Sequence, residues 1–317
     1  MAMINRRSFI TGIKSIILSN KEKKFLKKFK PWGIILFSRN IDSLNQTKKL
    51  TEDIRKIFQD KKYPILLDQE GGRVNRLSKF FNADTLTSKY FGNLFKTNKY
   101  EFNYYYKIFI NKTSDLLKQI GININTSPVL DMRRKNANNI IGDRSFSNKA
   151  DIVNKIGNLC IKLFHRNNIG TVIKHIPGHG LAKVDSHKLT PTVNSKLNYL
   201  IKNDFSTFRN KKSFFAMTAH IIYSDIDKLN TATHSKKVIQ LVRKNIKFNS
   251  IIISDDISMK SLKYSIKKNT LKAFSAGCNL VLHCNANYRE MLIVAKNSPL
   301  VDSFIVKKTS QFYKILS

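Results

Sequence analysis

Residues 170–180 read Gly-Thr-Val-Ile-Lys-His-Ile-Pro-Gly-His-Gly, and Asp-Ser-His follows at 185–187. The apolar, β-branched start of this stretch is typical of a short buried strand. Lys174 and His175 would then emerge at the carboxyl end of the strand, where the side chains of a parallel sheet usually carry out chemistry. Because the proline and glycines that follow break regular structure, the sequence predicts an active-site loop.

Other short apolar runs also end in polar or charged residues. Asp68 follows the run at 64–67, His220 comes soon after 214–217, and Asp255 and Asp256 follow 251–254. Lys-rich segments with helical spacing lie between such runs, at 43–60, 151–167 and 235–245. Alternating strands and helices indicate a parallel α/β protein. Since so many strand ends carry reactive groups, we expect a closed TIM-type (β/α)8 barrel rather than an open sheet.

Seven strands of this barrel can be located by their apolar runs. They lie at about residues 33–37, 65–68, 122–125, 171–174, 214–218, 251–255 and 280–283. The eighth is not evident, and because the chain ends soon after the seventh strand we expect the last element to be short or irregular. A length of 317 residues with 42% hydrophobic residues fits one domain spanning 1–317.

The start of the chain has two possible interpretations. Asn-Arg-Arg-Ser-Phe-Ile at 5–10 resembles a twin-arginine export signal. However, Lys14 interrupts the apolar stretch and no small-residue cleavage site follows, so residues 9–18 can instead form the first strand or helix of the domain. No run of eighteen apolar residues predicts a membrane span. We therefore expect a cytoplasmic protein without a membrane partner.

The formal net charge of +36 would attract nucleic acid strongly. The Lys residues are nevertheless spread along nearly the whole chain, together with many Asn and Ile, as A/T-rich codons would produce. We therefore expect no specific nucleic-acid partner. Three cysteines, Cys160, Cys278 and Cys284, lie in apolar contexts without a pairing pattern, which indicates reduced thiols.

Two carboxylate motifs are candidates for catalysis. Asp255 closes an apolar strand and could attack an electrophilic carbon, or it could cap a helix beginning near 257; with Asp256 beside it, one residue could do each. Asp185 could raise the pKa of His187 and fix its tautomer, making a proton donor, or the pair could be an ordinary surface contact.

The histidines could also bind a metal ion. His175 and His179 have the His-x-x-x-His spacing of helical zinc sites, and His187 follows. Pro177 and the glycines make a helix improbable there, so metal binding is the weaker interpretation.

Together these motifs resemble those of the bacterial β-N-acetylhexosaminidases of glycoside hydrolase family 3, in the order of that family and over about residues 9–284. They are D-Q-E-G-G-R-V at 68–74 with Arg76, K-H-I-P-G-H-G at 174–180, D-S-H at 185–187, M-T-A-H at 217–220 and S-D-D-I-S-M at 254–259.

The resemblance implies a TIM-type barrel that removes terminal non-reducing N-acetylglucosamine from muropeptides during peptidoglycan recycling in the cytoplasm. It implies that Asp255 is the nucleophile and that His187, paired with Asp185, is the general acid/base. No metal or cofactor is expected, and we expect a monomer. The substrate-binding residues would be Asp68, Arg76, Arg144, Lys174 and His175. His220 matches a motif position without an assigned role.

Two alternatives remain. A related exo-glycosidase for another sugar, such as a β-glucosidase, would keep Asp255 but need not keep the Asp185 and His187 pair. A non-catalytic protein that binds carbohydrate or nucleic acid would need none of these ionisable groups.

Overall fold

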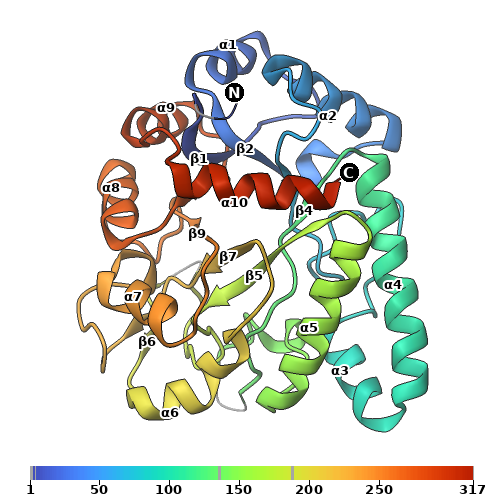
Figure 1. Cartoon of the computed structure of the whole chain (residues 1–317), viewed down its shortest axis with the longest axis vertical. Helices are drawn as coiled ribbons and strands as arrows, with labels where there is room; N and C mark the ends of the chain where they lie inside the picture. The colour runs from blue at the N-terminus through green and yellow to red at the C-terminus, as the bar shows by residue number, and fades with distance from the viewer. Residues whose placement is uncertain (1–2, 4, 135–136, 187–188, 317) are drawn as a thin grey trace.

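The computed structural model describes residues 3, 5–134, 137–186 and 189–316. Within these residues, eight parallel strands close into a barrel in the order β1-β10-β9-β7-β5-β4-β3-β2 (Figure 1). The strands are β1 (Arg7–Gly12), β2 (Pro31–Leu36), β3 (Ile65–Leu67), β4 (Ile124–Asn125), β5 (Gly170–Ile176), β7 (Phe215–Thr218), β9 (Ile251–Asp256) and β10 (Leu280–His283). The predicted fold class is confirmed.

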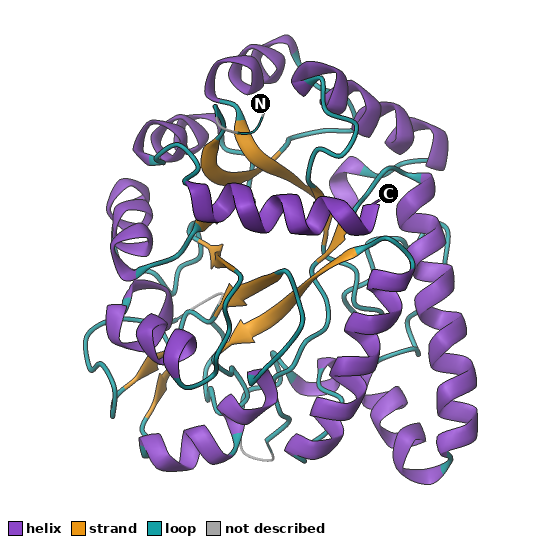
Figure 2. Ribbon diagram, viewed as in Figure 1, coloured by secondary structure: helices purple, strands orange, loops and turns teal. Residues whose placement is uncertain are grey.

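Helices surround the barrel (Figure 2). They are α1 (Asn20–Phe29), α2 (Leu44–Phe58), α3 (Ser88–Thr97), α4 (Lys99–Gln119), α5 (Ala150–Arg166), α6 (Leu197–Lys202), α7 (Lys236–Lys244), α8 (Ile266–Ala276), α9 (Tyr288–Asn297) and α10 (Ser303–Tyr313). The helices predicted at 43–60, 151–167 and 235–245 correspond to α2, α5 and α7. No helix among the described residues is long and apolar enough to cross a membrane.

The eighth barrel strand is β1, near the N-terminus. We had expected the remaining barrel element after the strand at 280–283, near the C-terminus. β1 is a regular strand of six residues that pairs with both β2 and β10, with Phe9 opposite Val281. The expectation of a short or irregular eighth element after residue 283 is therefore wrong. The C-terminal segment forms α10 instead, which lies across the end of the barrel where the strands begin (Figure 1). Trp32 of β2 donates a hydrogen bond from Nε1 to Oγ1 of Thr309 in α10, at 2.9 Å.

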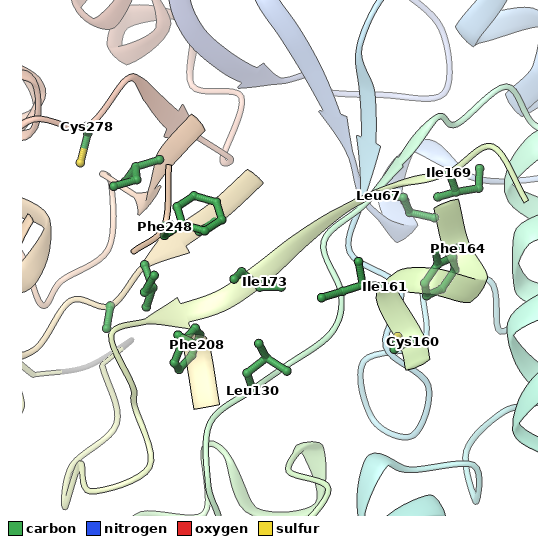
Figure 3. Packing of buried hydrophobic residues seen from close by; sticks show 14 of the residues in the cluster. Leu67, Leu130, Cys160, Ile161, Phe164, Ile169, Ile173, Phe208, Phe248 and Cys278 are labelled. Atoms are coloured by element: carbon green, nitrogen blue, oxygen red, sulfur yellow. The ribbon is translucent and has the colours of Figure 1, made fainter. Parts of the chain in front are cut away.

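Two apolar layers hold the barrel together. Side chains such as Ile251 and Ile253 point into the barrel, whereas Ile252 between them packs against the helices. Strands buried on both faces must be apolar at successive positions, which explains the continuous apolar runs in the sequence. Figure 3 shows part of the outer layer, where Ile161 of α5 and Ile173 of β5 belong to one cluster. Such packing is the main source of stability in a barrel of this size.

The two arginines of the export-like motif are part of the barrel framework. Arg6 is buried, and its Nη2 lies 2.6 Å from Oδ2 of Asp60, just after α2. The Tyr313 hydroxyl of α10 donates to the same carboxylate oxygen at 2.9 Å. Arg7 donates from Nη1 to the backbone oxygen of Ser298 at 2.7 Å. These bonds join the first strand to α2 and to the C-terminal segment.

We predict that Arg6→Ala lowers the free energy of unfolding by about 3 kcal/mol, because it leaves the Asp60 carboxylate without its buried cation. Lys56→Ala is the matched control, since the 3.4 Å pair of Lys56 with Asp53 is solvent-exposed and should contribute less than about 0.5 kcal/mol. Urea unfolding at neutral pH measures both. Equal small losses in the two variants would contradict a structural role for Arg6.

Candidate active site

A cavity of about 370 Å³ opens at the carboxyl ends of the barrel strands. The strands β3, β5 and β9 each end in charged residues of its wall, which is the position where parallel barrels place reactive groups. Besides Arg73 and Cys284, eight ionisable side chains line the cavity. They are Asp68, Arg76, Arg144, Lys174, His175, His179, Asp255 and Asp256.

A buried cluster of opposite charges forms one side of the cavity. The Lys174 ammonium contacts the carboxylate of Asp68 and lies 2.6 Å from Oε1 of Glu70. Arg144 donates to both carboxylate oxygens of Glu70, each at 2.8 Å, in the bidentate geometry that favours strong pairing. Arg76 adds a further contact, with Nη2 at 3.2 Å from Oδ2 of Asp68. The cluster joins β3, β5 and the loop that carries Arg144.

Mutual pairing keeps these groups ionised despite their burial. Burial by itself raises the pKa of Asp68, but the charges of Lys174 and Arg76 outweigh it and hold the pKa well below its usual range. Burial raises the pKa of Glu70 as well, but the charges of Arg144 and Lys174 outweigh burial and lower the pKa overall. Burial lowers the pKa of Lys174, yet Asp68 and Glu70 raise it overall. The site therefore presents fixed cations at neutral pH.

A third carboxylate, the fully buried Asp131, organises the start of the loop after β5. It accepts hydrogen bonds from the backbone N–H of His175 at 3.1 Å, from the backbone N–H of His179 at 2.6 Å and from Nδ1 of His175 at 2.7 Å. Burial raises the pKa of Asp131, but the neighbouring His175 lowers it overall. Within the described residues, no three His, Cys, Asp or Glu side chains are grouped to hold a metal ion.

The two aspartates at the end of β9 have different surroundings. The backbone N–H of Asp255 donates to Oγ1 of Thr218 at 3.3 Å, and Oδ1 of Asp255 accepts from the backbone N–H of Asp256 at 2.7 Å. Oδ1 of Asp256 accepts from the backbone N–H and the hydroxyl of Ser258, at 3.1 and 2.8 Å. A turn follows Asp256, so the expected helix start near 257 is wrong. Asp256 caps this turn, and Asp255 lines the cavity.

His220 contacts the backbone at the end of β9, next to Asp255. Its Nε2 is 2.9 Å from the backbone oxygen of Asp256, and its Nδ1 is 2.7 Å from Oγ1 of Thr233. Burial lowers the pKa of His220, so the ring is neutral at neutral pH. The motif position without an assigned role thus supports the strand that carries Asp255.

The structure brings most of the predicted site residues together. Six of them line the one cavity, namely Asp68, Arg76, Arg144, Lys174, His175 and Asp255. Asp185 is half-buried and is not part of the described cavity wall, although its neighbour Ser186 is. His187 lies outside the described residues.

The sequence had not assigned a role to Glu70 or Asp131. Both are fully or nearly buried carboxylates in the segments that follow β3 and β4, and Glu70 belongs to the D-Q-E-G-G-R motif. Charge balance could have pointed to them. If Lys174 and Arg144 are both buried, the single carboxylate of Asp68 cannot neutralise the two cations, so a further buried carboxylate is needed.

Comparison with known proteins links this geometry to one family. Residues 10–311 match the model of the glycosyl hydrolase family 3 N terminal domain. A β-hexosaminidase of Idiomarina loihiensis is 31% identical over 279 residues, which cover 84% of this chain and 81% of that protein.

Solved structures agree with this match. Native NagZ of Neisseria gonorrhoeae superimposes with a TM-score of 0.85 at 26% identity, covering 99% of this chain and 90% of that one. The same protein has been solved in complex with N-trifluoroacetyl-D-glucosamine. A family 3 β-N-acetylglucosaminidase from Paenibacillus sp. gives a TM-score of 0.86 at 24% identity; it covers 99% of this chain, which spans 61% of that one, and shows the shared barrel.

We predict that Glu70→Gln lowers the free energy of unfolding at pH 7 by about 3 kcal/mol, because Lys174 and Arg144 lose a buried partner. The folded protein lowers the pKa of Glu70 below its ordinary value of 4.5. Its contribution is therefore complete above pH 4.5 and is lost as the pH falls through the lowered value. Urea unfolding of wild type and variant between pH 7 and pH 3 should show the difference shrinking in acid.

Glu52→Gln is the control for this prediction, because Glu52 is exposed on α2 and its loss should change stability little at any pH. A difference between wild type and Glu70→Gln that stays constant down to pH 3 would contradict the assigned pairing.

Proposed function

Since this chain belongs to glycoside hydrolase family 3 and is a β-N-acetylhexosaminidase of that family, we propose that it removes terminal non-reducing β-linked N-acetylglucosamine from muropeptides. The observation that carries this proposal is the cavity in which Asp255 lies with the cations Lys174, Arg144 and Arg76. A complex of the Neisseria gonorrhoeae relative with a glucosamine derivative supports the choice of sugar.

In this proposal Asp255 is the nucleophile. An ionised carboxylate at a strand end needs no base, and its oxygen would form a bond to the anomeric carbon while the bond to the leaving oxygen breaks. The leaving oxygen would take a proton from His187. Water would then hydrolyse the glycosyl ester after giving a proton to the neutral imidazole, which restores both groups and retains the anomeric configuration.

His187 paired with Asp185 would replace the second carboxylate that most retaining glycosidases use. A neutral imidazole can accept a proton from water without adding a second negative charge beside Asp255. Asp185 would fix the tautomer and support the charged form of the ring. The motif D-S-H at 185–187 supports this assignment.

The substrate would be held by the charged wall of the cavity. Lys174, Arg144 and Arg76 are donors with fixed charge, and charge-assisted hydrogen bonds to hydroxyl and acetamido groups are stronger than neutral ones. Asp68 would accept from sugar hydroxyls while remaining ionised beside Lys174. His175 would act beside them, with its ring oriented by Asp131.

The cellular setting belongs to the same proposal. Muropeptide hydrolysis would be a step of peptidoglycan recycling in the cytoplasm, carried out by a monomer whose residues 1–317 form one catalytic domain. A family 3 enzyme for another sugar, such as a β-glucosidase, is the second candidate, because it would also use Asp255.

We predict that the wild type hydrolyses 4-nitrophenyl β-N-acetylglucosaminide and leaves the corresponding β-glucoside nearly untouched. Asp255→Ala should lose more than about 1000-fold in kcat, and His187→Ala about 100-fold, because general acid/base catalysis contributes about 100- to 10,000-fold. Release of 4-nitrophenol measures all variants, and circular dichroism confirms folding.

Asp53→Ala is the control variant, since Asp53 lies on the outer helix α2 in an exposed ion pair. Preference for the glucoside would favour the second candidate. A folded wild-type protein without activity on either substrate would overturn the proposed function.

A further inference from the structure

The loop after β5 is fixed at its beginning by several buried contacts. Asp131 binds the backbone N–H groups of His175 and His179, and the Tyr223 hydroxyl donates to the backbone oxygen of Gly178 at 2.6 Å. Gly180 packs directly on the backbone of Met132, where an added Cβ would lie 2.1 Å from its carbonyl oxygen. The glycine therefore permits close packing here, and residues 175–180 form a rigid base.

One side-chain hydrogen bond extends this base to the Asp-Ser-His motif. Nε2 of His179 lies 3.1 Å from Oγ of Ser186, and both residues are buried, with exposed fractions of 3% and 4%. Both also line the cavity that contains Asp255. The contact spans seven residues of loop and connects the rigid base to the residue between Asp185 and His187.

The protonation of His179 can be assigned from its partners. Among the residues that the structure describes, Nδ1 of this ring has no hydrogen-bond partner. Burial and then the neighbouring His175 lower the pKa of His179 to about 4, so the ring is neutral at neutral pH. The tautomer that leaves no buried N–H unpaired has its proton on Nε2 and donates it to Ser186. The ring is thus a fixed donor to the serine hydroxyl.

We propose that the hydrogen bond from His179 to Ser186 positions the proton donor of the reaction. The inference rests on the proposed function, in which the residues on either side of Ser186 form the acid/base pair. A general acid must reach the leaving oxygen within hydrogen-bond distance, so a small displacement of its backbone reduces proton transfer sharply. Ser186 and His179 are positioning residues in this scheme, because they act through His187.

The leaving group of the substrate provides a selective test. A 2,4-dinitrophenyl leaving group departs without a proton, whereas a 4-methoxyphenyl group requires one. We expect Ser186→Ala to lower kcat/KM at least about 30-fold on the 4-methoxyphenyl β-N-acetylglucosaminide and less than about threefold on the 2,4-dinitrophenyl compound. The quantity kcat/KM is chosen because it reports the first chemical step in both cases. An equal loss on both substrates would overturn the proposal, since it would indicate a binding or folding defect.

Exchanges at His179 test the same bond from its other end. His179→Gln places an amide N–H near the position of Nε2 and should retain most of the activity, whereas His179→Leu should reproduce the selective loss of Ser186→Ala. Ser114→Ala is the control for removal of a buried serine hydroxyl, because the Ser114 hydroxyl donates to the backbone oxygen of Ile110 within α4. Equal activities of His179→Gln and His179→Leu on the 4-methoxyphenyl substrate would contradict the proposal.

The double variant Ser186→Ala with His187→Ala separates this proposal from the proposed function. If Ser186 acts through His187, the double variant should be no slower than His187→Ala alone, because the losses are not additive. Multiplying losses would show that Ser186 acts independently and would overturn the inference. If His187→Ala itself loses nothing on the 4-methoxyphenyl substrate, the acid/base assignment of the proposed function fails, whatever the serine variants show.

Discussion

The buried charges beside the cavity impose the main constraint on this structure. Lys174 cannot remain ionised in a barrel interior without carboxylates, and Arg144 likewise depends on Glu70. These partners come from β3, from β5 and from a long loop after β4, so three distant segments are fixed relative to one another. The barrel is the scaffold that permits this arrangement, since parallel strands deliver all their carboxyl ends to one face. Function and local stability therefore depend on the same ionic contacts.

Much of this architecture could be read from the sequence. Continuous apolar runs marked seven strands because the strands are buried on both faces, and charged residues after those runs marked the cavity. Asp68, Lys174 and Asp255 were found in this way, and they do line one cavity. Their roles in catalysis and binding remain predictions. What the sequence could not supply was which ions pair, because pairing depends on the strand order of a closed barrel.

The features that the sequence analysis missed also depend on contacts between distant parts of the chain. Residues 9–18 were considered as a first strand or helix but not as the eighth barrel strand, because β1 begins with Arg7 and contains Ser8 and Thr11. These last two polar residues are buried between β2 and β10. Asp131 was visible as a carboxylate after an apolar run, but its bonds to the histidines 44 and 48 positions later are tertiary. A helix was expected to begin near 257, yet the chain there forms a turn in which the Asp256 side chain accepts from Ser258. The local sequence pattern identifies most strands and helices, whereas contacts across the barrel decide which strands pair and which side chains bond to one another.

The pairing of β1 with β10 also has a consequence for how the chain folds during synthesis. Phe9 is opposite Val281, so the barrel cannot close until β10 has been made, and β10 follows all the other barrel strands along the chain. Until then both strands that flank the gap present unpaired backbone groups, which in open sheets favour pairing with other chains. A nascent chain stalled before residue 280 would thus be an open, aggregation-prone sheet. The order of synthesis leaves this edge exposed while all the strands between β1 and β10 are being made.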